Sequence, residues 1–320
     1  MRFSSIFKII ILNIFISKMA HAAVCEERYP ADSEECQYVQ ELEQKAEQGD
    51  ESAQFSLGSW YAEGRYVKPD YKLAIKWLEK AGKQGSDFSY FILGYHYNYG
   101  ENFPLSRQKA LEWYRKAAEL GDSSTQEILG DAYMYGDGFP QNTQLALAWY
   151  RKAARQGLPA AQTHLGIMSA FGRGVAQSDR QAIAWYRKAA KQDFAKAQYQ
   201  LGVAYNTGRG VPENSRNALK WYLKAAEQGF TPAQLALGEI YAHGRQGVPK
   251  DNKQAYIWYY MASIYTEKSK DDCSALIAER NRLKGMLTPD QLSETYAAFD
   301  LIRRKINQSK EAKKIARKKY

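Results

Sequence analysis

The chain has 320 residues, of which 45% are hydrophobic and 25% charged, a composition typical of a folded protein and not of a disordered or collagen-like one. The net charge of +10 suggests a nucleic-acid partner, but residues 1–22 contribute +3 and residues 301–320 contribute +8, which leaves −1 for the rest. A nearly neutral central part does not indicate a phosphate-binding face, so we expect no nucleic-acid partner.

The first 22 residues have the organisation of a secretory signal peptide. Arg2 and Lys8 precede an apolar run over residues 9–16, and the segment ends in Ala20-His21-Ala22. A basic start, a short apolar core and an A-x-A cleavage pattern are typical of such signals, and the run is far shorter than the about 20 residues that cross a bilayer. We therefore expect cleavage after Ala22 and a periplasmic or secreted mature protein.

Three cysteines remain after that cleavage. Cys25 and Cys36 are close in sequence, and an exported protein encounters an oxidising compartment, so we predict a disulfide between them. Cys273 then stays single, and the sequence leaves open whether it is buried or reactive.

A repeat of 36 residues organises the central part of the chain. A Leu-Gly pair occurs six times at this interval, from Leu57-Gly58 to Leu237-Gly238. The tryptophans from Trp77 to Trp221 keep the same interval, and Trp258 comes one residue late because Gln246 is inserted. A fixed period of this length predicts a supersecondary unit that buries its apolar side chains by stacking on the next unit.

Each unit is predicted to form two helices joined by a glycine-containing turn. In the fifth copy, Ala197, Leu201 and Tyr205 form an apolar stripe on the first helix. We expect the recurring Trp of the second helix to pack in the core between helix pairs, and the Lys three residues later to lie on a solvated face. Good N-cap residues precede all six second helices: Asp70, Ser106, Asn142, Ser178, Asn214 and Asp251. Glycines suited to the C′ position follow four of these helices: Gly85, Gly121, Gly157 and Gly229. Asp193 takes the place of this glycine in the fourth copy.

Additional helices are predicted at both ends of the repeats. Residues 32–48 carry Tyr38, Leu42 and Ala46 at four-residue spacing and resemble half a unit. Residues 272–285 and 289–306 are predicted to form closing helices, the second of which begins with a capping box, Thr288-Pro289-Asp290-Gln291.

The pattern A-x-x-x-L-G-x-x-Y-x-x-G-x-G, followed by an N-cap and A-x-x-W-Y-x-K-A-A-x-x-G, resembles the Sel1-like repeat, a relative of the tetratricopeptide repeat. The resemblance implies an all-α fold, a right-handed α/α superhelical solenoid of six repeats with capping helices at both ends. The chain is accordingly divided into a signal peptide, an N-terminal capping segment, the repeats, C-terminal capping helices and a basic tail: residues 1–22, 23–45, 46–263, 264–307 and 308–320.

No catalytic, cofactor or metal site is predicted, and we expect a protein that is not an enzyme. Some cysteine-rich Sel1-like proteins are described as penicillin-binding or β-lactamase-like, but the repeats of this chain contain no Cys. Ser106 and Lys109 match S-x-x-K, yet Ser106 is the expected N-cap and the companion motifs are absent. A β-lactamase-like hydrolase remains the alternative from another class.

The resemblance implies a protein partner bound in the concave groove that the first helices line. Positions two before and two, five and six after the repeated Leu point away from the packed stripe, and they differ most between copies. The predicted groove residues are Phe91, Tyr95, Asn98 and Tyr99 in copy two, Glu127, Asp131, Met134 and Tyr135 in copy three, and Thr163, Ile167, Ala170 and Phe171 in copy four.

Exported members of the family include adaptors of cell-envelope enzymes, host-interaction factors and immunity proteins against type VI phospholipase effectors. The resemblance leaves these roles open, along with the oligomeric state. A second interpretation concerns residues 301–320, which place apolar residues among nine bases and could contact an anionic envelope surface. A solvated C-terminus is the alternative.

Overall fold

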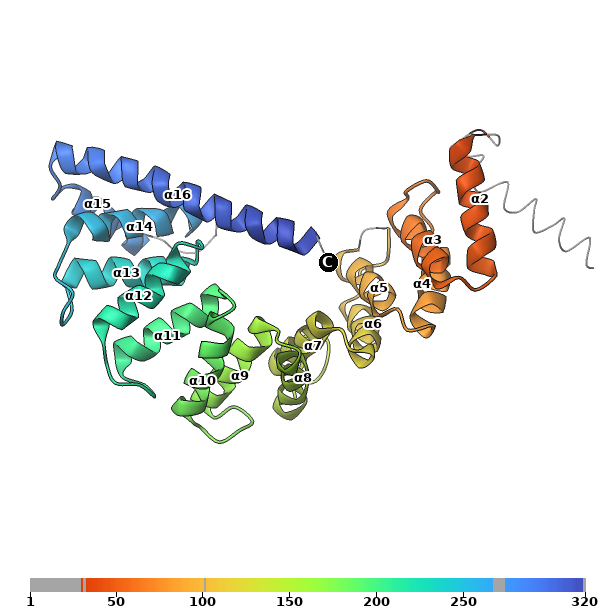
Figure 1. Ribbon diagram of the computed structural model, residues 1–320, viewed down its shortest axis with the longest axis horizontal. Helices are drawn as coiled ribbons and strands as arrows, with labels where there is room; N and C mark the ends of the chain where they lie inside the picture. The colour runs from red at the N-terminus through yellow and green to blue at the C-terminus, as the bar shows by residue number, and fades with distance from the viewer. Residues whose placement is uncertain (1–29, 31–32, 101, 267–273, 319–320) are drawn as a thin grey trace, which may run out of the picture. The chain divides into compact units, whose positions relative to one another are not determined.

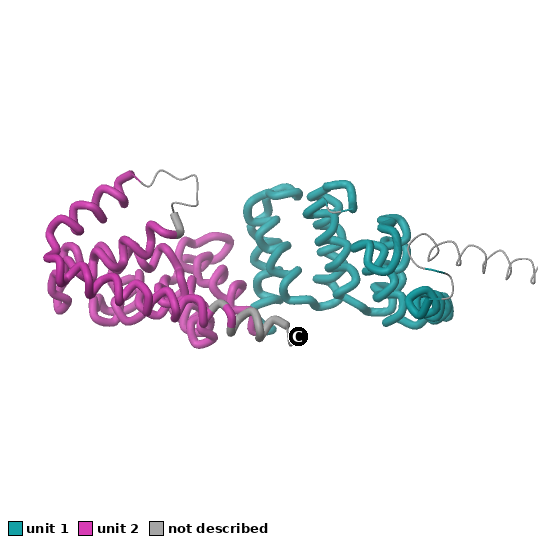
Figure 2. Tube along the Cα trace, turned by 90° about the horizontal axis from the view of Figure 1, so that it is seen from above, with its two compact units in different colours: residues 1–156 teal, residues 157–320 magenta. Residues whose placement is uncertain are grey.

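The computed structural model describes residues 30, 33–100, 102–266 and 274–318, and this part of the chain folds into fifteen helices (Figure 1). Among these residues, the β-structure is a single isolated bridge between Arg245 and Val248. The predicted signal peptide, Cys25 and Cys273 lie outside the described residues, so the predictions made for them stay predictions. The chain divides into two compact units, residues 1–156 and 157–320 (Figure 2).

Both units consist of α-helical hairpins, which confirms the all-α solenoid fold. Each repeat contributes a first and a second helix, and the second helix also contacts the first helix of the next repeat in the same unit. Unit 1 contains α2 (Glu34–Glu47), α3 (Glu51–Glu63), α4 (Tyr71–Lys83), α5 (Asp87–Tyr99), α6 (Arg107–Leu120), α7 (Ser123–Tyr135) and α8 (Thr143–Arg155). Unit 2 contains α9 (Pro159–Phe171), α10 (Asp179–Ala190), α11 (Ala195–Thr207), α12 (Ser215–Ala226), α13 (Thr231–His243), α14 (Asn252–Thr266), α15 (Ser274–Lys284) and α16 (Pro289–Lys318).

The repeated glycine of the Leu-Gly pair makes room for an aromatic ring from the second helix. The ring of Tyr150 on α8 lies directly against Gly130 on α7, and a methyl group at Gly130 would overlap it. The same pairing occurs in copies two to six, and in copy one Leu78 faces Gly58. The Tyr that follows the repeated Trp is therefore the buried core residue of each hairpin: Tyr114, Tyr150, Tyr186, Tyr222 and Tyr259.

The recurring tryptophans are less buried than the sequence predicts. Trp77 and Trp258 are buried, but the other four indoles of the series are half-buried. The Lys three residues later covers the indole face in copies one to five, with its Nζ 3.9–4.8 Å from the ring centroid. The indole thus lies at the edge of the core, where its outer face forms a cation–π contact, and the repeated Lys is part of that contact.

All six predicted N-caps are confirmed by hydrogen bonds in which the side-chain oxygen accepts a backbone N–H of the first turn. The distances from Asp70 Oδ1 are 2.8 Å to Lys72 N and 3.1 Å to Leu73 N. The other five caps each accept one bond, at 2.9–3.3 Å. At the other end of α10, Asp193 has φ 57°, so it adopts the left-handed conformation in place of the glycine.

A pair of glutamines joins the two ends of most repeats, a feature that sequence reasoning missed. In copy three, Gln156 Nε2 donates to Gln126 Oε1 at 3.0 Å and to Gly121 O at 2.7 Å, and buried Gln126 donates to Ala118 O at 3.0 Å. Equivalent pairs close copies one, four and five. In copy two, Tyr90 stands at the position of Gln126 and Leu120 at the position of Gln156, so neither glutamine is present.

The face that α2 buries differs from the predicted one. Cys36, Val39 and Glu43 are buried together with Ala46, whereas Tyr38 is 54% exposed. The buried carboxylate of Glu43 accepts a hydrogen bond from Tyr61 Oη at 3.1 Å, which accounts for an acidic residue on the packed face. Tyr38 instead rests against Trp60, with ring centroids 5.5 Å apart.

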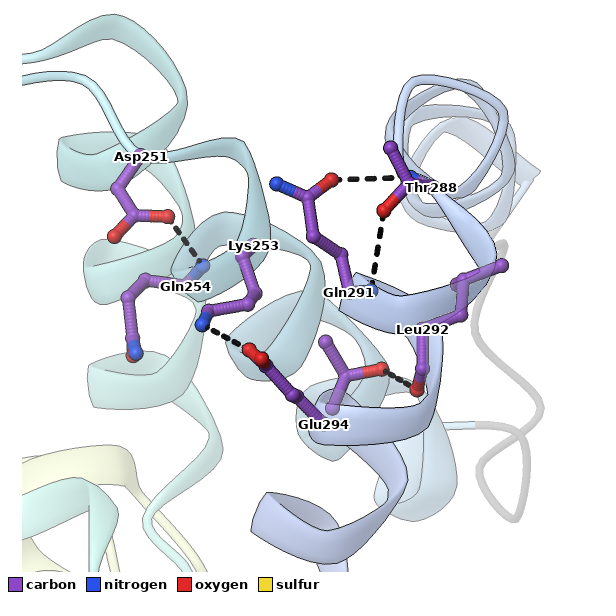
Figure 3. Close-up of polar contacts among 8 residues, drawn as sticks. Asp251, Lys253, Gln254, Thr288, Gln291, Leu292 and Glu294 are labelled. Atoms are coloured by element: carbon purple, nitrogen blue, oxygen red, sulfur yellow. Dashed lines mark hydrogen bonds and ion pairs between the residues drawn. The ribbon is translucent and has the colours of Figure 1, made fainter.

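The predicted capping box at the start of α16 is confirmed. Gln291 N donates to Thr288 Oγ1 at 3.2 Å, and Thr288 N donates to Gln291 Oε1 at 3.0 Å (Figure 3). Lys253 on α14 bonds Glu294 on α16 at 2.6 Å in the same region. The helix continues to Lys318, so the predicted division between residues 307 and 308 falls inside α16.

Candidate partner-binding surface

The first helices share one position that is exposed in every copy. It lies six residues after the repeated Leu, at the last residue of each first helix, where the helix leaves the packed stripe. In unit 1 this position holds Tyr99, which is 61% exposed, and Tyr135, which is 66% exposed. In unit 2 it holds Phe171, which is also exposed. Three successive copies thus present an aromatic ring to solvent at the same helical position.

Helix α5 carries a continuous row of aromatic side chains, Phe88, Phe91, Tyr95 and Tyr99, which we call the aromatic row. Their spacing of three, four and four residues places them on one side of the helix. Successive ring centroids are 5.7, 6.5 and 4.6 Å apart. Phe91 is half-buried because it also packs on Tyr114 of α6, at 5.8 Å, while the other three are exposed. The row is therefore anchored in the core and open to solvent along its length.

The corresponding surface of α7 is acidic. Asp131 Oδ1 accepts a hydrogen bond from Tyr150 Oη at 2.6 Å, and Glu127 and Tyr135 lie near the same phenol. Burial raises the pKa of Tyr150, and the hydrogen bond to Asp131 raises it further, so the phenol stays protonated as a donor. A carboxylate is in this way held at the surface of unit 1 next to an exposed Tyr.

The side chain five residues after the repeated Leu is more buried than expected for a position that points away from the packed stripe. Met134 is only 7% exposed, so its prediction as a groove-surface residue is wrong. The side chains at this position turn toward the second helix of their own repeat. Asn98 Oδ1 accepts from Arg107 Nη1 of α6 at 2.7 Å, and Ala170 packs with Ala182 and Ile183 of α10.

Thr163 is also buried, and its hydroxyl is satisfied there because Oγ1 donates to Pro159 O, four residues earlier on α9, at 2.8 Å. Ile167 and Glu127 are half-buried. Of the predicted groove residues, Tyr95, Tyr99, Tyr135 and Phe171 are exposed. These findings concern exposure, and binding at these residues stays a prediction.

Unit 2 has a cavity on its first helices that sequence reasoning missed. It measures about 660 Å³ and lies at α11 and α13, lined among others by Tyr199, Asn206, Glu239, His243 and Arg245. Tyr199, Asn206, Glu239 and His243 occupy the same four repeat positions as the predicted groove residues, so extending the pattern to copies five and six would have identified them. Burial, and then the Glu239 carboxylate, raises the pKa of Tyr199.

Ser106, Lys109 and the buried His96 have structural roles. Ser106 Oγ accepts from Lys109 N at 3.3 Å, as an N-cap does, and Lys109 Nζ lies 5.5 Å from the ring centroid of Tyr97. His96 is buried with its ring stacked on Phe103 at 5.0 Å. The S-x-x-K match is therefore accounted for by helix capping.

Comparison with known proteins gives a consistent result. The sequence model described as "Sel1 repeat" matches residues 51–86, 88–122, 123–158, 159–194, 195–230 and 231–263. The chain is similar to a protective antigen present in uropathogenic Escherichia coli strains, whose crystal structure displays an SLR fold. The identity is 35% and the TM-score 0.69, over 85% of this chain and 57% of that one.

The chain is also similar to a Sel1 repeat protein from Oxalobacter formigenes, with 30% identity and a TM-score of 0.64 over 81% of this chain and 79% of that one. A more distant likeness, with 22% identity and a TM-score of 0.42, is to an immunity protein from Pseudomonas aeruginosa, over 68% of this chain and 83% of that one. This chain spans 57% of the length of the E. coli antigen. No curated protein matches it significantly.

None of the described helices has the length and apolar character needed to cross a bilayer.

Proposed function

Because the chain belongs to the Sel1 repeat family, we propose that it is a scaffold that holds a partner protein against the exposed side chains of its first helices. Sel1 repeat proteins mediate protein–protein interactions and are generally non-catalytic. The proposal places the contact on unit 1, at the aromatic row of α5 and at Tyr135 of α7.

The observation that carries the proposal is the exposure of the aromatic row. Tyr and other aromatic residues are enriched at the centres of protein interfaces, because they bury a large area while losing little conformational freedom. A contiguous exposed apolar patch on a folded protein marks an interaction site more often than a scattered residue does. Phe91 fixes the row against Tyr114, so the exposed rings are already positioned before a partner arrives.

The charges beside the row indicate the kind of partner surface. Glu127 and Asp131 lie on α7 near Tyr135, and the first helices of unit 1 carry no Lys or Arg. Complementary charge favours correct encounter and orientation at an interface. We therefore propose a partner whose contacting surface combines apolar side chains with Lys or Arg.

Capture of the partner tests the proposal. The mature chain, immobilised by a tag, is incubated with cell-envelope extract of the bacterium that encodes it, and bound proteins are identified by mass spectrometry. Tyr99→Ala with Tyr135→Ala should weaken the affinity for the captured partner by about 30- to 1,000-fold, since interface tyrosines of this kind contribute about 1–2 kcal/mol each. The thermal midpoint should change little because both rings are largely exposed.

The matched control is Tyr38→Ala, which removes an exposed Tyr of unit 1 that lies on α2 against Trp60 of α3, outside the aromatic row and α7. This variant should capture the partner normally. Equal capture by the double variant and the wild type would contradict the proposal, as would a loss of capture that is equal in the control. An effector enzyme as the partner would assign an immunity role, and a cell-envelope enzyme would assign an adaptor role.

We propose in addition that the protein is exported and acts in the periplasm or outside the cell. The basic start, short apolar run and A-x-A motif of residues 1–22 support this. The N-terminal sequence of the protein recovered from the periplasm should begin at Ala23. A full-length protein confined to the cytoplasm would refute export.

We propose that the protein does no chemistry of its own. The N-cap role of Ser106 supports this, because its Oγ is already engaged by the backbone of α6. Nitrocefin incubated with the purified protein should show no turnover above buffer. Turnover that Ser106→Ala abolishes would instead assign a hydrolase.

A further inference from the structure

Unit 1 separates its charges between its two sets of helices. The second helices α4, α6 and α8 carry eleven basic and three acidic side chains, which gives a net charge of +8. The first helices α3, α5 and α7 carry five acidic side chains and no Lys or Arg, which gives −5 with His96 neutral. The nearly neutral total of the central part of the chain therefore conceals a strongly basic surface. We call the solvent side of α4, α6 and α8 the basic face.

The acidic side chains of these helices neutralise little of that charge. Glu79 Oε1 lies 3.4 Å from Lys83 Nζ and 3.7 Å from Lys116 Nζ, and Glu119 pairs with Arg115 at 3.1 Å. Exposed pairs of this kind are weak and leave the surplus of positive charge in place. Three further basic side chains are exposed and form no ion pair or ring contact with any described residue: Lys72, Arg151 and Arg155.

The lysines that cover the indoles hold part of this charge at a fixed place in each repeat. Lys80, Lys116 and Lys152 lie 4.5, 3.9 and 4.0 Å from the indole centroids of Trp77, Trp113 and Trp149. The repeat thus places an ammonium group above an indole on all three second helices of unit 1. Indole and ammonium groups together are typical of side chains that sit at the level of lipid headgroups.

The basic face lacks the composition of a protein interface. Its exposed large apolar side chains within the described residues are Tyr71, Leu120 and Leu145, one on each helix. A protein interface has a mainly apolar centre with few charges, which describes the aromatic row of the first helices and not this face. Long Lys and Arg side chains spread over three helices, among them the unpaired Lys72, Arg151 and Arg155 of α4 and α8, instead match an extended anionic surface whose charges can rearrange.

We propose that the basic face of unit 1 docks the protein on a bilayer surface of anionic phospholipids. Contact is electrostatic and peripheral, through Lys and Arg of α4, α6 and α8, and the first helices remain free to bind a protein. This inference stands independently of the proposed partner, because it concerns the other set of helices.

Vesicle sedimentation tests the docking. The mature wild-type protein should co-sediment with vesicles of phosphatidylcholine and phosphatidylglycerol in a 3:1 ratio at 0.1 M salt, and stay in the supernatant with pure phosphatidylcholine. Binding should be lost near 1 M salt, where the screening length falls from about 10 Å to about 3 Å. The variant Lys72→Gln with Arg151→Gln and Arg155→Gln should bind about a hundredfold more weakly, since each basic residue near an anionic surface contributes about fivefold.

The control removes the same charge elsewhere. Lys250→Gln with Arg303→Gln and Arg304→Gln takes three exposed basic residues from unit 2 and should bind the vesicles nearly as well as the wild type. Circular dichroism melting checks that both variants fold. An equal loss of binding in the control would overturn the proposal, since the contact would then depend on total charge or on α16.

Other outcomes also decide the matter. Tighter binding to heparin or duplex DNA than to the anionic vesicles would assign the face to a polyanion and overturn the lipid proposal. Tyr99→Ala with Tyr135→Ala should leave vesicle binding unchanged, and the basic-face variant should leave partner capture unchanged. The docking and the proposed function therefore fail separately.

Discussion

Replacing Gly130 by Ala should destabilise the protein, although Ala is the better helix former. A methyl group at Gly130 would overlap the ring of Tyr150, and overpacking of this kind costs about 1–3 kcal/mol. Displacing the ring also lengthens the 2.6 Å bond between Tyr150 Oη and Asp131, which contributes about 1.5–3 kcal/mol as a bond to a charged group. The higher helix propensity of Ala offsets about 1 kcal/mol of this destabilisation. The expected net loss is about 1.5–5 kcal/mol.

Urea unfolding followed by circular dichroism measures this loss. The matched control is Gly285→Ala, because a methyl group there meets only ordinary contacts, the nearest at 3.5 Å, and the φ of Gly285 is not positive. The control should be neutral or slightly more stable. In a Tyr150→Phe background the hydrogen bond is already absent, so Gly130→Ala should cost less than in the wild type. A Gly130→Ala variant as stable as Gly285→Ala would refute the packing account of the repeated glycine.

Two further predictions follow from the buried polar groups. Burial raises the pKa of Tyr114 and Tyr186 to about 12, so the folded state favours the protonated phenols. Their contribution to stability should be constant below pH 10 and should be lost between pH 10 and 12, because the unfolded chain ionises first; urea midpoints that do not fall between pH 10 and 12 would contradict this. Gln126→Ala should cost about 1–3 kcal/mol in urea unfolding because it leaves the carbonyl of Ala118 without its side-chain donor. Gln126→Tyr with Gln156→Leu and Ala118→Gly, the combination that copy two has as Tyr90, Leu120 and Gly82, should cost less, because Gly82 leaves room for the ring of Tyr90; equal losses would show that these positions are not coupled.

The repeat and its hairpins could be predicted from the sequence because they depend on local chemistry. A side-chain oxygen at an N-cap bonds the next turn of its own helix, so residues such as Asn142 mark a helix start regardless of their surroundings. The capping box of Thr288 and Gln291 is local in the same way. The period of 36 residues implied stacked pairs because each apolar stripe needs a neighbour to cover it.

The candidate site was only partly predictable, since exposure depends on what packs beside each residue. Angles around an isolated helix placed Met134 and Tyr135 together on an open face, yet Met134 is buried and Tyr135 is exposed. At the position of Met134, the second helix of the hairpin contacts the equivalent residues of copies two and four, as Arg107 of α6 does with Asn98. A helical wheel contains no information about such contacts between helices.

The sequence by itself determined the helices, their caps and the repeat of this protein, because hydrogen bonds and apolar spacing within one turn or one hairpin specify them. Only the tertiary structure decided that Tyr150, and not Trp149, fills the core against Gly130, and that Lys152 covers the indole. It also decided that a nearly neutral central sequence becomes, in unit 1, an acidic aromatic surface and a basic one. The physical reason is that net charge and composition are sums over the chain, whereas binding depends on which side chains the packing of helices gathers on one surface.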